Sequence, residues 1–191
     1  MGTFARLLLL LGVVFAVAAP ASTAPGDAGP NWKALERPLH LPHLTSGARC
    51  PATALAPQIT GAKYGVGGAV GPGPVYPVLG RPSLFTVFRR DGWGTWAGQK
   101  VLWFVLPDYT GPVLIRGRRL DGPQLMRFDG GAHPASEIRL APGETVTWTG
   151  QVPGSRGRPS DVRVRVPGCY GVQIDGTSFS EVVVFPVSTG R

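Results

Sequence analysis

The chain has few cysteines, few charged residues and no long uninterrupted helical pattern. Its 191 residues include 2 Cys and only 16% charged residues, against 28 Gly and 20 Pro. Frequent glycine and proline break helices and favour turns, so long helices are not expected. A chain of this length and composition predicts one domain of the all-β class.

Beyond its N-terminus the sequence has no apolar run long enough to span a bilayer. The run Leu7–Ala19 follows Arg6 and is shorter than the roughly 20 residues of a membrane helix, which is typical of a secretory signal. We therefore predict a signal peptide over residues 1–21, cleaved after Ala21 or else after Ala18. The protein is then secreted, without stable membrane insertion; the alternative, an uncleaved anchor, is disfavoured by the length of the run.

Acidic residues are outnumbered by basic ones, 11 against 19, which gives a formal charge of +8. Such an excess can serve an anionic partner such as nucleic acid, a phospholipid surface or an acidic wall polymer. The arginines are dispersed, however, and no run of basic residues with interleaved aromatics occurs. We predict that nucleic acid is not a partner.

The sequence contains no complete catalytic, cofactor or metal motif. Residues 65–68, "GVGG", are followed by Val70 where a dinucleotide loop needs its last glycine, and a proline between His40 and His43 prevents their pairing on a helix. The segment "GTSFS" at residues 176–180 ends in serine where a nucleophile motif needs glycine. We predict no catalytic residue, no metal site and no cofactor. The alternative is a hydrolase built from scattered carboxylates and His133.

The chain changes character near residue 84. Residues 22–83 are dense in glycine and proline and predict an extended leader and loop, with a short strand at Val75–Leu79. Residues 84–191 alternate strand-forming runs with turns and predict a β domain. The predicted strands cover residues 84–90, 100–106, 112–116, 124–128, 136–140, 145–149, 161–166, 169–174 and 180–187. Short strands at this spacing favour an antiparallel sandwich, with a β-barrel as the alternative.

The clearest alternation of apolar and polar residues is the sequence "DVRVRV". Val162, Val164 and Val166 share one face of this predicted strand, and Arg163 and Arg165 share the other. We expect the valines to be buried and the arginines to lie on a solvated face of the sheet.

The strand order from residue 84 to residue 187, with Trp103 in a central strand and "PGCY" opening the penultimate one, resembles an immunoglobulin-like β-sandwich. The C-terminal "GCY" and "SFS" segments are similar to those of uncharacterised secreted bacterial proteins. Two features depart from antibody-type domains: no Cys lies on an early strand, and Tyr170 follows the cysteine instead of preceding it by two residues. The resemblance implies a fold but no activity, because this fold hosts many unrelated functions.

The second cysteine opens the segment "CYGVQI". Side chains alternate along a strand, so Tyr170, Val172 and Ile174 face the core and Cys169 lies outward. Cys50 is the only other cysteine, and export favours oxidation of the pair. We predict a disulfide between Cys50 and Cys169 that pins the leader to the outside of the sandwich, in preference to a catalytic cysteine.

The main candidate for function is the aromatic turn "RRDGWGTWAG". It places Trp93 and Trp96 among small and polar residues, where burial of both is hard to arrange. Exposed tryptophans can stack on sugar rings or anchor a protein partner, with Arg89, Arg90 and Asp91 supplying hydrogen bonds. The alternative is that one tryptophan folds back to cap the end of the sandwich.

These observations favour a secreted, non-catalytic binding or accessory module that recognises a cell-envelope glycan or protein through this turn. The alternatives are a structural or adhesive envelope domain without a small ligand, and a hydrolase. A concave face lined by tryptophan would favour the binding module. An exposed sheet edge would favour the adhesive domain, and a deep pocket with converging Asp and His would favour the hydrolase.

Overall fold

The structure is a computed structural model that describes residues 29–59, 61–81, 84–142, 144 and 152–190. This part of the chain consists mainly of strands, with two helices of 4 residues each, which confirms the all-β prediction. The elements are α1 (Trp32–Leu35), α2 (Gly61–Tyr64), β1 (Val75–Val78), β2 (Phe85–Arg89), β3 (Ala97–Val105), β4 (Val113–Arg119), β5 (Arg127–Phe128), β6 (Glu137–Leu140), β7 (Arg156–Val164), β8 (Gly168–Gly176) and β9 (Ser180–Thr189). The predicted signal peptide and the predicted strand at 145–149 lie outside the described residues.

The strands follow the predicted ones closely, and β3 and β7 extend further than their sequences indicate. β3 begins at Ala97 although glycine and glutamine follow it, and β7 begins at Arg156 although it contains Pro159. The two strands pair in antiparallel register over their whole length, from Ala97 opposite Val164 to Val105 opposite Arg156. Partner strands therefore hold residues in extended form whose own preference for strands is weak.

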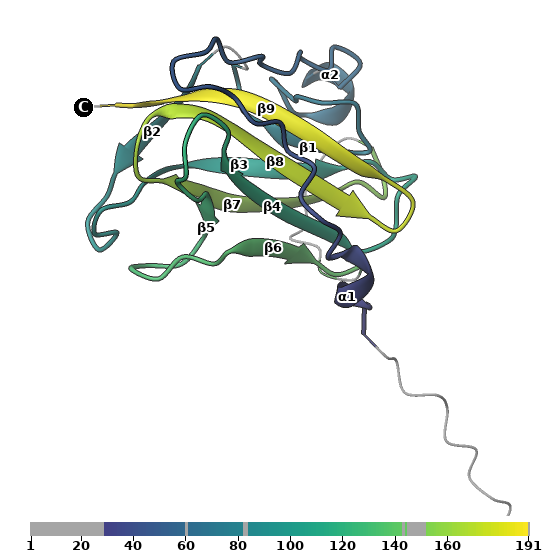
Figure 1. Cartoon of the computed structure of the whole chain (residues 1–191). Coiled ribbons are helices and arrows are strands. Elements are labelled where there is room, and N and C mark those ends of the chain that lie inside the picture. Colours follow the sequence, from purple (N-terminus) through teal and green to yellow (C-terminus); the bar gives the residue numbers. More distant parts are fainter. Residues whose placement is uncertain (1–28, 60, 82–83, 143, 145–151, 191) are drawn as a thin grey trace, which may run out of the picture.

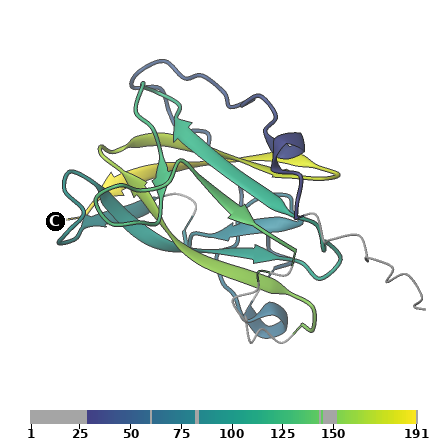
Figure 2. The ribbon, with the colours of Figure 1, turned by 90° about the horizontal axis from the view of Figure 1, so that it is seen from below.

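All strands belong to one curled sheet. Its order is β5-β7-β3-β2-β9-β8-β4-β6, with β1 also paired to β3. β2 carries the sheet around a corner: Phe88 and Arg89 pair antiparallel with β3, whereas residues 85–87 pair parallel with β9. At the two ends of the sheet, a bridge between Phe128 of β5 and Ala135 links β5 to the residues before β6. The result is a nearly closed barrel, in which β9, β8 and β4 lie in front of β3 and β7 (Figures 1 and 2).

One hydrophobic core fills the barrel. Trp103 and Phe128 meet edge to face at 6.2 Å between ring centroids, and Phe85 meets Phe185 in the same way at 5.6 Å. The indole N–H of Trp103 donates to Ser160 Oγ at 2.8 Å, so the one polar atom of this buried ring is satisfied. The core therefore joins both halves of the sheet through β2, β3, β5 and β9.

The predicted register of β8 is correct, and so is the disulfide. Tyr170, Val172 and Ile174 are fully buried in the core. Cys169 points outward into a second apolar cluster and is bonded to Cys50, with a Cα–Cα distance of 5.4 Å. The bond holds the N-terminal part of the chain against the outside of β8, as predicted.

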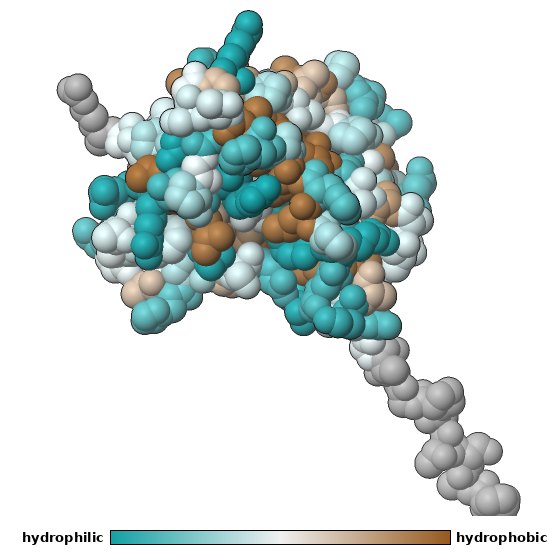
Figure 3. All heavy atoms as spheres, viewed as in Figure 1, coloured by the Kyte–Doolittle hydropathy of each residue, from teal (hydrophilic) through white to brown (hydrophobic). Residues whose placement is uncertain are grey.

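Residues 36–53, which we call the N-terminal strap, cross the outer face of β4, β8 and β9 (Figure 1). The backbone N–H of Leu44 donates to Leu120 O and that of Thr53 donates to Val184 O, each at 2.8 Å. Leu41 is buried among Leu120, Cys169 and Val184 beneath the strap. Apolar side chains appear in this face between hydrophilic ones (Figure 3). The strap thus covers apolar surface that β8 and β9 would otherwise expose.

Candidate functional site

The predicted aromatic turn joins β2 to β3 and folds back over the start of β3. The backbone N–H of Trp93 donates to Arg90 O at 3.2 Å, and that of Trp96 donates to Trp93 O at 3.1 Å. Gly92 and Gly94 adopt φ values of +75° and +60°, a region that favours glycine. These two consecutive turns direct both indole rings toward the sheet instead of into solvent.

The expectation that Trp93 and Trp96 are exposed side by side is wrong. Only 9% of Trp93 and 8% of Trp96 is exposed. The covering groups are arginines: the guanidinium carbon of Arg163 lies 3.6 Å from the centre of the Trp93 ring, and that of Arg165 lies 4.5 Å from the Trp96 ring. Guanidinium groups stack favourably on aromatic faces, and the sequence around the turn gave no sign that β7 would supply them.

A glycine on β3 makes room for this stack. A Cβ at Gly98 would lie 2.7 Å from Cζ3 of Trp93 and 2.9 Å from Cδ of Arg163. Any side chain at this position would push the indole and the arginine off the sheet. Gly98 is therefore part of the arrangement, although it carries no functional group.

Arg163 is fully buried, so the expected solvated face of β7 is wrong at this residue. Its guanidinium donates to the backbone carbonyls of Asp129 at 3.1 Å, Gly131 at 2.9 Å and Gly130. Burial lowers the pKa of Arg163 from its usual range. Val162 and Val164 are buried in the core as predicted, but β7 ends at Val164 and Val166 is only half-buried, so the prediction is wrong at Val166. The predicted inward and outward sides of β7 are correct, but the turn after β5 and the Trp93 ring cover the outward side at Arg163.

Strand pairing brings further arginines to the same place. Arg127 of β5 lies directly opposite Arg163 of β7, and Arg165 follows two residues later. Because Ala97 of β3 pairs with Val164, Trp96 comes beside Arg165. We call this surface the arginine-tryptophan face. It consists of Arg90, Trp93, Trp96, Arg127, Arg163 and Arg165.

A cavity of about 390 Å³ opens at this face. Its lining comprises Trp96, Pro123, Gln124, Leu125, Arg127 and Arg165. Leu125 is 50% exposed, and Arg127 is oriented by a 3.2 Å hydrogen bond from Nη1 to Met126 O. Among the described residues, no carboxylate lies within ion-pair distance of Arg127 or Arg165. Two positive charges at the cavity thus have no internal counterion.

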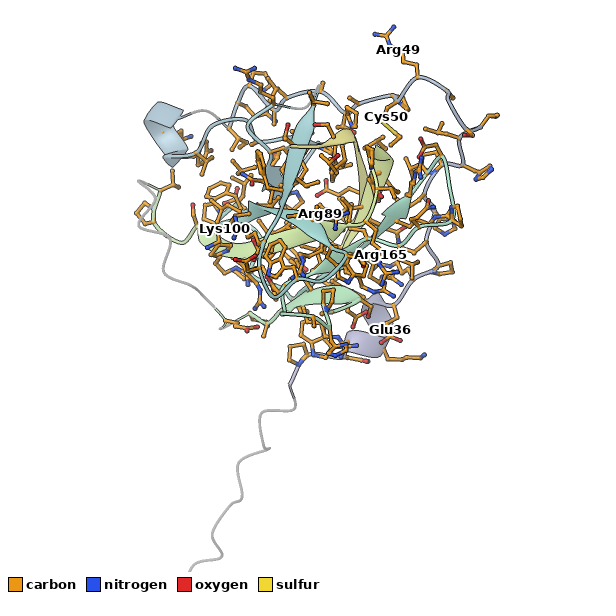
Figure 4. The ribbon with its side chains drawn as sticks, turned by 90° about the vertical axis from the view of Figure 1, so that its left-hand side faces the viewer. Glu36, Arg49, Cys50, Arg89, Lys100 and Arg165 are labelled. Atoms are coloured by element: carbon orange, nitrogen blue, oxygen red, sulfur yellow. A yellow bond between two sulfur atoms is a disulfide. The ribbon has the colours of Figure 1, made fainter. Side chains whose placement is uncertain are left out.

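The other predicted site residues divide into two groups. Arg90 joins the face: its guanidinium lies 5.0 Å from the Trp93 ring and 3.9 Å from Asp161. Arg89, which is labelled in Figure 4, is exposed opposite Ala97, and Asp91 is exposed in the turn. Arg89 and Asp91 therefore flank the face without lining its cavity.

Sequence reasoning missed Arg127, Gln124 and Leu125. Their position depends on the pairing of β5 with β7 and of Leu125 with Arg118, and no local pattern announces these contacts. Among the described residues, no group of three or more His, Cys, Asp or Glu could hold a metal ion. His40, His43 and His133 are all exposed.

Two buried carboxylates were also missed. Asp175 of β8 accepts hydrogen bonds from Arg116 at 2.7 Å and from Ser180 Oγ at 2.6 Å, and from Arg37 of the strap at 3.4 Å. Glu181 of β9 points into the barrel, and burial raises its pKa to about 7. The signal for Glu181 was available, because it shares the inward face of β9 with Val183, Phe185 and Val187.

Comparisons with known proteins leave the chain unassigned. No protein-family model matches it, and no curated protein matches it. A solved structure, the CooA pilin subunit from enterotoxigenic Escherichia coli, aligns over 61% of this chain and 96% of its own length, with 8% identity and a TM-score of 0.35. No helix in the described part of the chain is long and apolar enough to cross a membrane. At this TM-score the alignment supports neither a fold family nor a function.

Proposed function

We propose that the chain is a secreted, non-catalytic module that binds an anionic partner at the cell surface through the arginine-tryptophan face. The observation that carries the proposal is that Arg127 and Arg165 line a cavity of about 390 Å³ and form no ion pair with any described residue. Arg116 and Arg119 are paired with the carboxylates of Asp175 and Asp121, whereas Arg127 donates one hydrogen bond, from Nη1 to Met126 O. Arg127 and Arg165 retain donors for a ligand.

Stacking prepares Arg165 for binding. Its guanidinium rests on the Trp96 ring, so less side-chain freedom is lost when it meets an anion. The same stacking removes the open ring face that a neutral sugar would need. The indoles therefore act by holding arginines in place, which revises the expected role of Trp93 and Trp96.

We also propose that the protein is secreted and that its barrel is related to the immunoglobulin-like fold. The disulfide is consistent with an oxidising compartment. The spatial orders β2-β3-β7-β5 and β9-β8-β4-β6 resemble the A-B-E-D and G-F-C strand orders of that fold and so support the proposal. The strand added beside C, β6, follows β5 along the chain, whereas the immunoglobulin order places such a strand before D. Tyr170, at the start of β8, donates its hydroxyl to Val166 O at 2.8 Å, in the manner of a tyrosine corner.

The adhesive alternative has less support. It needs an exposed sheet edge, and the edge strands of the described sheet are short: β5 has 2 residues, and β6 and β1 have 4 residues each. Such short edges are poor templates for pairing with another chain. The hydrolase alternative needs converging Asp and His, and the cavity at the arginine-tryptophan face is lined by neither.

The test is retention of the protein on immobilised polygalacturonate and polyglutamate, with neutral dextran as a blank. We expect retention on both polyanions that weakens with salt, because the contacts are ionic. The double variant Arg127→Ala/Arg165→Ala should lose retention. A matched variant, Arg49→Ala/Arg81→Ala, removes the same charge at exposed positions off the face and should keep it. Equal loss in both variants would show that net charge alone, not this face, is responsible.

A further inference from the structure

We infer that the arginine-tryptophan face takes a segment of a partner protein in which a carboxylate side chain stands next to an apolar side chain. This inference rests on the proposed function and specifies its ligand. Three properties of the cavity lead to it. Its polar side chains are hydrogen-bond donors, part of its wall is aliphatic, and the neighbouring aromatic rings are covered.

The polar side chains of the cavity offer donors. Arg127 and Arg165 carry only N–H groups, and Gln124 uses its Oε1 to accept from Arg119 at 2.9 Å. Arg127 stands opposite Arg163 and Arg165 is two residues further on, a diagonal separation of roughly 7–8 Å that long side chains can close. Two guanidinium groups can therefore converge on one carboxylate, which accepts in a bidentate manner. Neutral hydroxyl groups need acceptors as well, and these side chains supply few.

Beside the donors lies an aliphatic wall. Pro123 and Leu125 line the cavity next to Trp96, and half of the Leu125 surface is open to solvent. A bridge to Arg118 of β4 fixes the backbone at Leu125, so this wall is preformed. The volume of about 390 Å³ is near the lower end of the range for ligand sites and suits two adjacent side chains. An apolar side chain next to the carboxylate would cover Leu125.

The covered rings distinguish a peptide from a glycan or a nucleic acid. Sugars and unpaired bases are bound on open aromatic faces. Here Arg163 and Arg90 lie over Trp93 at 3.6 Å and 5.0 Å, and Arg165 lies over Trp96 at 4.5 Å. A carboxylate with an aliphatic neighbour uses what the face does present, namely guanidinium N–H groups and the Leu125 side chain.

The experiment measures binding of short fluorescent peptides with blocked ends to the exported protein. The peptides are identical except for a central pair, which is Asp-Leu, Asn-Leu or Asp-Ser. We expect Asp-Leu to bind about tenfold more tightly than either of the others, because each lacks one half of the ligand. Arg127→Ala/Arg165→Ala should abolish the preference for Asp, whereas Leu125→Ser should abolish only the preference for Leu. Arg49→Ala/Arg81→Ala is the matched control and should bind as the unmodified protein does.

Three results would overturn the inference: no peptide binds, the three peptides bind equally, or the Leu preference survives in Leu125→Ser. A galacturonate oligosaccharide or an oligonucleotide of the same charge is measured alongside. If either binds as tightly as Asp-Leu and is lost in Arg127→Ala/Arg165→Ala, the partner is not a peptide. In that case, retention on polyanions still supports the proposed function. Loss of both peptide binding and polyanion retention would reject the two together.

Discussion

The arginines on two outer surfaces of the barrel have different interaction partners. On β4 and β8, the strap covers the sheet, and Arg116 is paired with the buried Asp175 at 2.7 Å and also donates to Arg37 O at 2.6 Å. On β5 and β7, no strap formed by the described residues covers the sheet. Arg163 donates to carbonyls, and Arg165 stacks on an indole ring without a counterion in the same part of the chain. The first surface is closed by its own chain, and the second keeps charge available to a partner.

This difference distinguishes arginines that stabilise the fold from arginines that are available to bind a ligand. A buried charge without partners is costly, so an arginine in the fold donates to carboxylates or carbonyls of its own chain, as Arg116 and Arg163 do. An arginine that faces solvent on an aromatic ring carries little of that cost and can exchange water for a ligand. The predictions below test this distinction, beginning with the bond that holds the strap.

Removing the disulfide should have the largest effect on the covered surface. Cys50 and Cys169 are 119 residues apart, and loop-closure entropy for such a separation gives roughly 4 to 5 kcal/mol as an upper value. We expect Cys50→Ala/Cys169→Ala to lose about 4 kcal/mol of unfolding free energy, measured by urea denaturation. A loss below about 1 kcal/mol would show that the polar contacts of the strap suffice without the bond.

Arg116→Ala should be the next most damaging change. It leaves Asp175, which is fully buried, without its shortest ion pair, and breaking such a pair costs about 3 kcal/mol. The strap should loosen as well, because Arg116 also holds the carbonyl of Arg37. Urea denaturation measures the first effect and limited proteolysis within the strap the second. Arg49→Ala, at an exposed position of the strap, is the control and should change neither.

The sequence predicted the strands well and the coverage of their faces poorly. Alternation in "DVRVRV" and "CYGVQI" correctly identified the buried Val162, Val164 and Tyr170, because one side of each strand meets the core. Alternation of apolar and polar residues does not indicate what packs on the outward face of each strand. Arg163 was therefore expected in solvent and is fully buried against the Trp93 ring.

The candidate site was predicted only in part. The glycine-rich turn drew attention to Trp93 and Trp96, which do lie at the face, but their exposure was wrong because the covering groups come from a strand far away in sequence. Arg127 could not be predicted, since its place depends on how a strand of 2 residues pairs with β7. Contacts of this kind are set by topology, which one sequence does not reveal.

Glu181 should make the protein less stable as pH rises. It lies opposite Ile174 on the inner side of the β8–β9 ladder, and neither of its oxygens accepts a hydrogen bond of ordinary geometry from the described residues. Burial raises its pKa from 4.5 to about 7, so the folded protein keeps a proton that the unfolded chain releases. The protonated Glu181 carboxyl therefore contributes fully to the free energy of unfolding below pH 4.5. This contribution, about 3 kcal/mol, is lost as pH rises through about 7.

The measurement for Glu181 is urea denaturation between pH 4 and pH 8, with conditions chosen on both sides of the raised pKa. Glu181→Gln should remove most of this slope and be the more stable protein above pH 7. Asp91→Asn, at an exposed position, is the control and should leave the slope unchanged. A variant with the slope of the unmodified protein would assign the pH dependence to another group.

Arg165→Ala should have the smallest effect on stability, although Arg165 lies at the centre of the proposed binding surface. An exposed guanidinium stacked on an indole contributes about 0.5 kcal/mol, and no carboxylate or buried carbonyl loses a partner when it is removed. Arg163→Ala, two residues earlier, is the matched comparison: it removes a fully buried guanidinium that packs on Trp93 and donates to three backbone carbonyls, and it should cost about 2 kcal/mol. Urea denaturation of the two variants under the same conditions measures the difference. If Arg165→Ala destabilises the protein as much as Arg163→Ala, Arg165 serves the fold, and its lack of a counterion no longer marks a binding surface.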